Sequence, residues 1–314
     1  MIGRIKAALP AFLIKANRVS QRFGATVLPN HFYSEIPDFN ELAQSTGWRR
    51  PMSMFGIDHA TTAAQLTTLK AWVDAGKAAG DMAGVHGRAC EANGEAGFGP
   101  MEAQALYSFI VREKPTKIAQ VGCGVSTAII LEAAKAAGYT PALTCVEPYP
   151  TSLLQRLARE GSITLHNAKA QDVPLDELAA LADGGLLFVD STHTLRPGSE
   201  VIVLISEVLP RLTPGTWAHF HDIYFPYDYG PALLEEGVFQ FRENTLLYGF
   251  LVNNSNWRIE VCMSMLHHAE RDGLGQVLLG YEPMPMRDGL RDGPGQFPAS
   301  IYLRSVAGPD SRIS

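Results

Sequence analysis

Two short segments of the chain hold acids and histidines at spacings that could do chemistry. The apolar residues 186–189 are followed by Asp190-Ser191-Thr192-His193, and Trp217-Ala218-His219-Phe220 is followed by His221-Asp222. Carboxylates and imidazoles together can bind a divalent cation, and a further histidine can then act as a general base. The two segments therefore predict an active site, either with a cation held by Asp190, Asp222 and a histidine or with a metal-free acid–base pair.

A parallel sheet must bring these segments together. From residue 117 onward, short apolar runs alternate with helical patterns, which is typical of a doubly wound, mostly parallel α/β sheet. We predict seven strands, at residues 117–121, 142–147, 162–166, 185–190, 215–221, 257–263 and 300–304, with helices at 127–137, 151–159, 174–182, 198–212 and 239–253. Ligands bind beyond the carboxyl ends of such strands, where both segments fall. Alternation along the fifth strand places His219 and His221 on one face and Phe220 on the other.

A glycine turn follows the first strand. Residues 116–126 read Thr-Lys-Ile-Ala-Gln-Val-Gly-Cys-Gly-Val-Ser and lead into a helical pattern. Gly122 and Gly124 leave room for a ligand against the main chain, and the next helix offers N–H groups to it. Thr127 stands where a dinucleotide fingerprint needs its third glycine, so the turn favours a nucleoside over a pyrophosphate.

Two further positions fit a nucleoside. Glu147 ends the second strand, where a carboxylate can accept hydrogen bonds from both ribose hydroxyls. Ala170-Gln171-Asp172 follows the third strand, where Gln171 could bond an adenine edge and Asp172 could instead cap a helix. A tight turn with a solvated strand-end acid is the alternative interpretation of Gly122, Gly124 and Glu147.

Composition limits the class of protein. The 314 residues include 46% apolar residues, enough for a full core, and the net charge of −6 with no basic run argues against a nucleic-acid partner. The four cysteines are far apart and without a Cys-x-x-Cys pair, which argues against a zinc site and a disulfide framework and suits the cytoplasm.

The rest of the chain frames the predicted sheet. Residues 1–98 are predicted to form a helical and loop cap, with a loop over 28–42 and a helix over 61–79, and a helix over 101–112 leads into the domain at 99–314. Residues 264–299 look like an insertion or lid. The basic N-terminus has an apolar run too short for a membrane span and is not favoured as a secretory signal, so a peripheral or oligomer-forming amphipathic arm stays open.

Several motifs in this order resemble one family. They are residues 32–38 (Phe-Tyr-Ser-Glu-Ile-Pro-Asp), 99–103 (Gly-Pro-Met-Glu-Ala), 120–127 (Gln-Val-Gly-Cys-Gly-Val-Ser-Thr), 146–149 (Val-Glu-Pro-Tyr), 189–193 (Val-Asp-Ser-Thr-His), 219–223 (His-Phe-His-Asp-Ile) and 226–229 (Pro-Tyr-Asp-Tyr). The chain resembles the class I S-adenosylmethionine-dependent methyltransferases with a seven-stranded Rossmann-like fold, in a branch similar to the macrocin-type sugar O-methyltransferases.

The resemblance implies S-adenosylmethionine as cofactor, with Mg²⁺ or another divalent cation as an optional second one. It implies three sets of site residues: cofactor contacts from Gln120, Gly122, Gly124, Ser126, Glu147, Gln171 and Asp190, catalytic roles for His193 and His221, and metal ligation by Asp190, His221 and Asp222. Two positions depart from the family pattern, because Gln120 replaces the usual acid of the first strand and His221 replaces an acid that often precedes the second aspartate.

Methyl transfer to a hydroxyl of a small molecule, a sugar or a secondary metabolite, is thus the expected function, with nitrogen acceptors and a homo-oligomer left open. The alternatives are a non-catalytic cofactor-binding protein, a nicotinamide oxidoreductase, which the missing third glycine argues against, and a metal-dependent hydroxylase, since Asp and His ligands also suit iron.

Overall fold

The computed structural model describes residues 2–28, 30, 33–237 and 241–306. The chain divides into two compact units: the larger comprises residues 49–233 and 241–306, and the smaller comprises the described parts of residues 1–48 and 234–240. The prediction of a separate cap over residues 1–98 stays a prediction. Of the predicted segments, residues 29 and 31–32 of the loop and residues 239–240 of the last helix lie outside the described residues.

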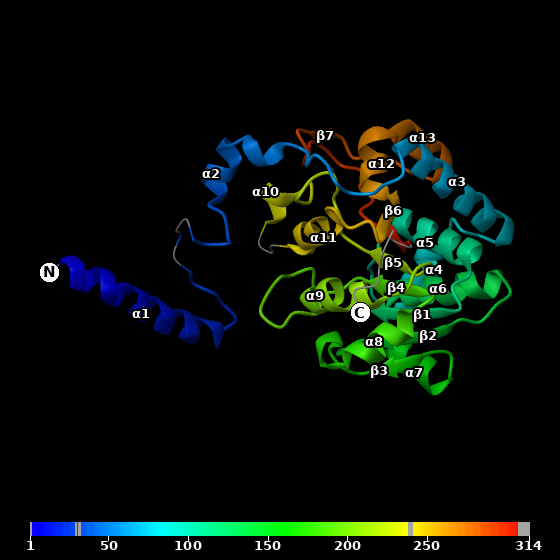
Figure 1. The fold of residues 1–314 in the computed structure, drawn as a ribbon, viewed down its shortest axis with the longest axis horizontal. Coiled ribbons are helices and arrows are strands. Elements are labelled where there is room, and N and C mark those ends of the chain that lie inside the picture. Colours follow the sequence, from blue (N-terminus) through cyan, green and yellow to red (C-terminus); the bar gives the residue numbers. More distant parts are fainter. Residues whose placement is uncertain (1, 29, 31–32, 238–240, 307–314) are drawn as a thin grey trace. The chain divides into compact units, whose positions relative to one another are not determined.

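The larger unit is built on a seven-stranded sheet with helices on both sides (Figure 1). Its strands are β1 (Lys117–Val121), β2 (Ala142–Val146), β3 (Thr164–His166), β4 (Leu186–Val189), β5 (Trp217–Phe220), β6 (Trp257–Cys262) and β9 (Ile301–Ser305). The strand order is β3-β2-β1-β4-β5-β9-β6. Six of these strands run in the same direction, and β9 runs antiparallel to them. This confirms the predicted mostly parallel seven-stranded α/β fold.

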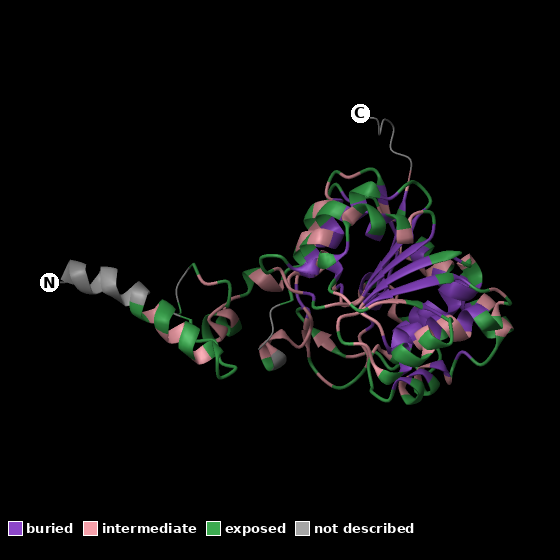
Figure 2. Cartoon of the chain, turned by 90° about the horizontal axis from the view of Figure 1, so that it is seen from below, coloured by how far each residue is buried: buried purple, intermediate pink, exposed green. Residues whose placement is uncertain are grey.

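The strands are nearly continuous apolar runs because both faces of the sheet are buried. Side chains alternate between two cores: Ile118 and Phe188 point into one, and Ala119 and Leu187 into the other. Figure 2 shows the strands as a twisted fan of buried residues. The carboxyl ends of β1, β2, β4 and β5 therefore meet at one edge of the sheet, where the predicted site residues lie.

Helices from different parts of the chain cover the two faces. The first core is formed with α3 (Thr62–Ala79), α4 (Val85–Asn93), α5 (Pro100–Glu113) and α6 (Val125–Ala136), and the second with α8 (Leu175–Ala182), α9 (Glu200–Val203) and α11 (Glu243–Leu251). The remaining helices are α1 (Ile2–Gln21), α2 (Phe39–Gln44), α7 (Ser152–Arg159), α10 (Leu233–Glu236), α12 (Met263–Ala269) and α13 (Arg271–Val277).

Two predicted segments contain several secondary-structure elements in place of the single helix or loop that the sequence predicts. The predicted helix at 198–212 starts as α9, continues as a π-helical turn over 204–208 and ends in a 3₁₀ turn over 209–211, which contains Pro210. The predicted insertion at 264–299 contains α12, α13 and a small hairpin of β7 (Met286–Arg287) and β8 (Leu290–Arg291). None of the helices that the described residues form is long and apolar enough to cross a membrane.

Candidate active site

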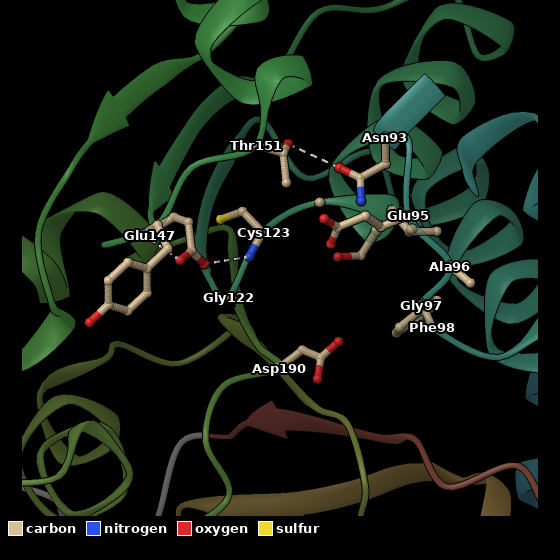
Figure 3. A pocket seen from close by; sticks show the side chains of 14 residues that line it. Asn93, Glu95, Ala96, Gly97, Phe98, Gly122, Cys123, Glu147, Thr151 and Asp190 are labelled. Atoms are coloured by element: carbon tan, nitrogen blue, oxygen red, sulfur yellow. Dashed lines mark hydrogen bonds between the residues drawn. The ribbon is translucent and has the colours of Figure 1, made fainter. Parts of the chain in front are cut away.

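A cavity of about 290 Å³ opens at the carboxyl ends of β1, β2 and β4 (Figure 3). It is lined by the glycine turn, by the strand-end acids and by the loop that follows α4: Asn93, Glu95, Ala96, Gly97, Phe98, Gly122, Cys123, Gly124, Val125, Ser126, Glu147, Tyr149, Thr151 and Asp190. Its volume is close to the lower end of the roughly 300–1,000 Å³ range of small-molecule sites. Five of the seven predicted cofactor contacts line it.

The turn at Gly122 requires glycine for two reasons. Its φ angle of +79° lies in the left-handed region. In addition, a Cβ atom at this position would overlap the main-chain oxygen of Asp190, because the end of β4 passes directly against the turn. Gly122 therefore lets the main chains of β1 and β4 meet at the cavity wall.

Gln120 does not line the cavity but holds this turn through hydrogen bonds from its buried side chain. Its buried amide donates to Ser126 Oγ at 2.7 Å and to Gly122 O at 3.3 Å, and its Oε1 accepts from Thr127 Oγ1 at 2.9 Å. Thr127 Oγ1 in turn accepts from Gly124 N at 3.1 Å. The residue that replaces the third glycine of a dinucleotide fingerprint thus holds the glycine turn in place.

Glu147 lies on the opposite wall of the cavity. Its Oε2 accepts from Cys123 N at 3.3 Å and its Oε1 from Tyr149 N at 2.9 Å. These two bonds fix the carboxylate at the cavity rim, as Figure 3 shows, and each oxygen keeps lone-pair capacity for a further donor. This is the position in which the sequence predicts a ribose-binding acid.

His193 lies behind Asp190 in a cluster of acids. Its Nδ1 is 2.7 Å from Glu243 Oε2, and its Nε2 is 3.4 Å from Asp190 Oδ1 and 3.6 Å from Asp222 Oδ2. His193 and Asp222 both have left-handed main-chain angles, with φ of +58° and +56°. Such angles in non-glycine residues are strained and cluster at functional sites.

The electrostatics of this cluster favour charged histidines. Burial alone lowers the pKa of His193, but hydrogen bonds to Asp190 and Glu243 outweigh it and raise the pKa well above its ordinary value. Burial likewise lowers the pKa of His221, and Asp190 and Asp222 raise it to about 9. Burial raises the pKa of Asp222, while His221 and His193 bring it down to about 2. The cluster is a set of coupled ion pairs.

His221 joins this cluster and His219 does not. His221 Nδ1 is 3.5 Å from Asp190 Oδ1 and 3.3 Å from Asp222 Oδ1, and its ring packs 4.8 Å from Phe98. His219 is fully buried and stacks on Phe188 at 4.3 Å. Burial lowers its pKa well below the ordinary value, so it is a neutral aromatic member of the core.

The prediction of a divalent-cation site at Asp190, His221 and Asp222 is not supported. Among the residues that the structure describes, no group of three or more His, Cys, Asp or Glu side chains is arranged to hold a metal ion. The three side chains instead contact one another, with His221 Nδ1 3.5 Å from Asp190 Oδ1 and 3.3 Å from Asp222 Oδ1. The metal-dependent hydroxylase stays a prediction that this arrangement does not support.

Sequence reasoning missed two parts of the site. One is the cavity wall formed by residues 93–98, where the glycines of Gly94-Glu95-Ala96-Gly97-Phe98-Gly99 mark a loop but do not indicate what it faces. The other is Glu243, an ordinary surface residue by sequence that is 1% exposed. Gln171 lies in a 3₁₀ turn over residues 170–172 and does not line the cavity, so its contact with adenine stays a prediction.

Comparison with known proteins agrees with this geometry. Residues 119–223, which run from β1 to the end of the His-Asp segment, match the family described as "Methyltransferase domain". That match covers about a third of the chain and, together with the seven-stranded sheet, supports a methyltransferase domain in this part of the protein. The macrocin-type branch is not confirmed and stays a prediction.

Individual relatives are distant. An uncharacterized protein of Archaeoglobus fulgidus is 26% identical over 189 residues, which cover 57% of this chain and 80% of that protein. Two solved structures are each 12% identical: the Podospora anserina methyltransferase PaMTH1 bound to SAH (TM-score 0.40, covering 90% of this chain and 100% of that one) and the plantazolicin methyltransferase BpumL with SAH and a pentazolic desmethylPZN analog (TM-score 0.39, 77% and 98%).

Proposed function

We propose that the chain transfers a methyl group from S-adenosylmethionine to a hydroxyl group of a small molecule, with His193 as the general base. One observation carries this proposal: the carboxylate of Asp190 lines the cavity and also lies 3.4 Å from His193 Nε2. The candidate cofactor site and the candidate base are therefore joined by a single side chain.

The residues of the cavity fit this cofactor. Gly122 lets the turn pass against the main chain of Asp190 and so shapes the cavity wall. Glu147 presents a carboxylate to the ribose hydroxyls, and Asp190 offers a negative charge to the cationic end of the molecule. When bound, S-adenosylmethionine supplies a methyl group already activated by a sulfonium centre. The task left to the protein is to align an acceptor oxygen and to remove its proton.

Asp190 also links cofactor binding to the state of the base. In the free protein His193 is held protonated by the carboxylates around it. A positive charge bound beside Asp190 competes with His193 for that carboxylate, so the pKa of His193 falls when the cavity is filled. His193 then releases its Nε2 proton to solvent, and the neutral Nε2 accepts the proton of the acceptor hydroxyl, while Glu243 at Nδ1 keeps the ring oriented and stabilises the imidazolium that forms.

The acceptor is expected beside His193. Phe241 packs edge-on against the His193 ring at 5.2 Å and is 40% exposed, so it offers an apolar surface next to the base. This supports an organic acceptor such as a sugar derivative or a secondary metabolite. We also propose the cytoplasm as the compartment, because all four cysteines are free.

The first test is calorimetric titration with S-adenosylhomocysteine. Wild type should bind, Glu147→Gln should bind at least tenfold more weakly, and Glu177→Gln, which replaces an exposed carboxylate of α8, should match wild type. His193→Gln should keep its affinity for S-adenosylhomocysteine but lose methyl transfer from radiolabelled S-adenosylmethionine to a panel of sugar, polyketide and phenolic hydroxyls. Absence of binding by wild type would refute the cofactor, and turnover by His193→Gln would refute the base.

A further inference from the structure

Exposed apolar side chains are concentrated in one short part of the chain. Among the residues whose burial the structure describes, thirteen large hydrophobic residues are exposed, and eight of them lie between residues 12 and 36: Phe12, Ile14, Val19, Phe23, Val27, Leu28, Tyr33 and Ile36. Isolated exposed apolar residues are ordinary, but a concentration of this kind marks an interaction surface. All eight belong to the smaller unit, and none of them is among the residues that line the cavity.

The end of α1 arranges part of this set on one face. Phe12, Ala16 and Val19 follow one another at helical spacing, and Phe23 continues the series in the turn after the helix. Phe12 is 68% exposed and Phe23 is 83% exposed. The described residues of the smaller unit therefore leave this apolar face in contact with water.

Basic residues follow the same spacing beside the apolar face. Lys15 and Arg18 lie three residues apart on α1, and Arg22 comes four residues later. The first 34 residues contain five Lys or Arg and no Asp or Glu, whereas the whole chain has a net charge of −6, so the remaining 280 residues carry −11. This segment therefore has a net positive charge in an otherwise acidic chain.

We propose that α1 and the turn after it bind the surface of an anionic lipid bilayer, with Phe12, Val19 and Phe23 in the acyl region and Lys15, Arg18 and Arg22 at the lipid phosphates. An amphipathic helix with a basic flank and exposed aromatic residues is suited to lie in a bilayer interface. Charge selects this partner over pairing with the α1 of a second copy, because two such helices would bring like charges together. The inference is independent of the proposed function.

The experiment is co-sedimentation of the full chain with vesicles of phosphatidylcholine alone or with added phosphatidylglycerol. The chain should bind only the vesicles with phosphatidylglycerol, and less as salt is raised. Replacing Lys15, Arg18 and Arg22 together by Gln should weaken binding on the order of 100-fold, since each basic residue near an anionic surface contributes about a factor of five. A control that replaces exposed Lys135, Arg159 and Lys169 by Gln changes the net charge equally and should bind like wild type.

A second pair of variants tests the apolar face. Phe23→Ser should weaken binding to the same vesicles, whereas Phe55→Ser, which removes an equally exposed phenylalanine of the larger unit, should not. Circular dichroism and S-adenosylhomocysteine titration check that each variant is folded. Equal binding by wild type and the basic-residue variant would overturn the proposal. It would also be overturned if wild type does not bind the vesicles and instead forms a dimer, measured by light scattering, that Phe23→Ser dissociates.

Discussion

Replacing Glu243 by Gln should change the protonation of His193 in a measurable way. Glu243 is 1% exposed and its Oε2 lies 2.7 Å from His193 Nδ1, so the substitution keeps the shape of a buried pair and removes its negative charge. His193 has its pKa raised well above the ordinary value by Asp190 and Glu243 against the effect of burial. Removing one of these carboxylates must lower that pKa.

The size of the effect follows from the hydrogen bond. A bond to a charged partner contributes roughly 1.5–3 kcal/mol, and a neutral one roughly 0.5–1.5 kcal/mol. The midpoints of these ranges differ by about 1.2 kcal/mol, which favours only the protonated ring and corresponds to a fall of about one pKa unit. Asp190 and Asp222 keep their contacts with Nε2, so we expect the pKa to fall no further.

The pKa of His193 can be measured in histidine-labelled protein without an acceptor substrate. Imidazole resonances are followed by NMR from acid to alkaline pH, and the resonance of His193 is assigned as the one absent in His193→Gln. Glu91→Gln, on the exposed side of α4, is the matched control and should leave the resonance unchanged. The reasoning is refuted if His193 titrates at or below about 6.5 in wild type, or if Glu243→Gln leaves its pKa in place.

Further predictions concern the glycine turn and the buried histidines. Gly122→Ala should abolish S-adenosylhomocysteine binding, because the added Cβ would overlap the main-chain oxygen of Asp190. The control Gly138→Ala, at φ +70° with open space around it, should only lower stability by about 1 kcal/mol. Equal effects of the two substitutions would contradict this overlap. Thr127→Val should weaken S-adenosylhomocysteine binding and lower the free energy of unfolding by about 1–3 kcal/mol, because it leaves Gly124 N unpaired. The control Thr67→Val, on the exposed face of α3, should change the free energy of unfolding by no more than about 0.5 kcal/mol, measured by thermal unfolding. Burial and Arg271 lower the pKa of His267 to about 3, so its contribution to stability is present above about pH 6.5 and is lost as the pH falls toward 3. His267→Gln should therefore reduce the slope of unfolding free energy against pH in that window by up to about 1.4 kcal/mol per pH unit, and an unchanged slope would exclude it as the cause.

The sheet could be predicted from sequence because both of its faces are buried. Continuous apolar runs such as residues 117–121 and 186–189 have few other interpretations once they alternate with helices. The position of β9 between β5 and β6 could not be predicted, because an antiparallel strand that arrives after 38 further residues carries no local signal of its neighbours.

The candidate site was predictable only where it follows strand ends. Asp190, His193 and Asp222 are brought together by parallel register, which the sequence pattern encodes. Glu243 comes from a separate helix, and its burial depends on how α11 packs over the loop after β4: His193 O accepts from the N–H groups of Arg242 and Glu243. The ion pairs between these acids and the two histidines depend on distances of a few ångströms, which residue types alone do not give.

The place of β9 has a consequence for how this protein is made. Residues 301–305 are synthesised last among the strands, yet they separate β5 from β6 and bond to both. Until residues 301–305 are available, β5 and β6 each have an unpaired edge where β9 will bind, and such edges can pair with other chains. The earlier strands can pair with one another first, but β5 and β6 are joined only when residues 301–305 are available, so chains truncated before residue 301 should be prone to aggregate.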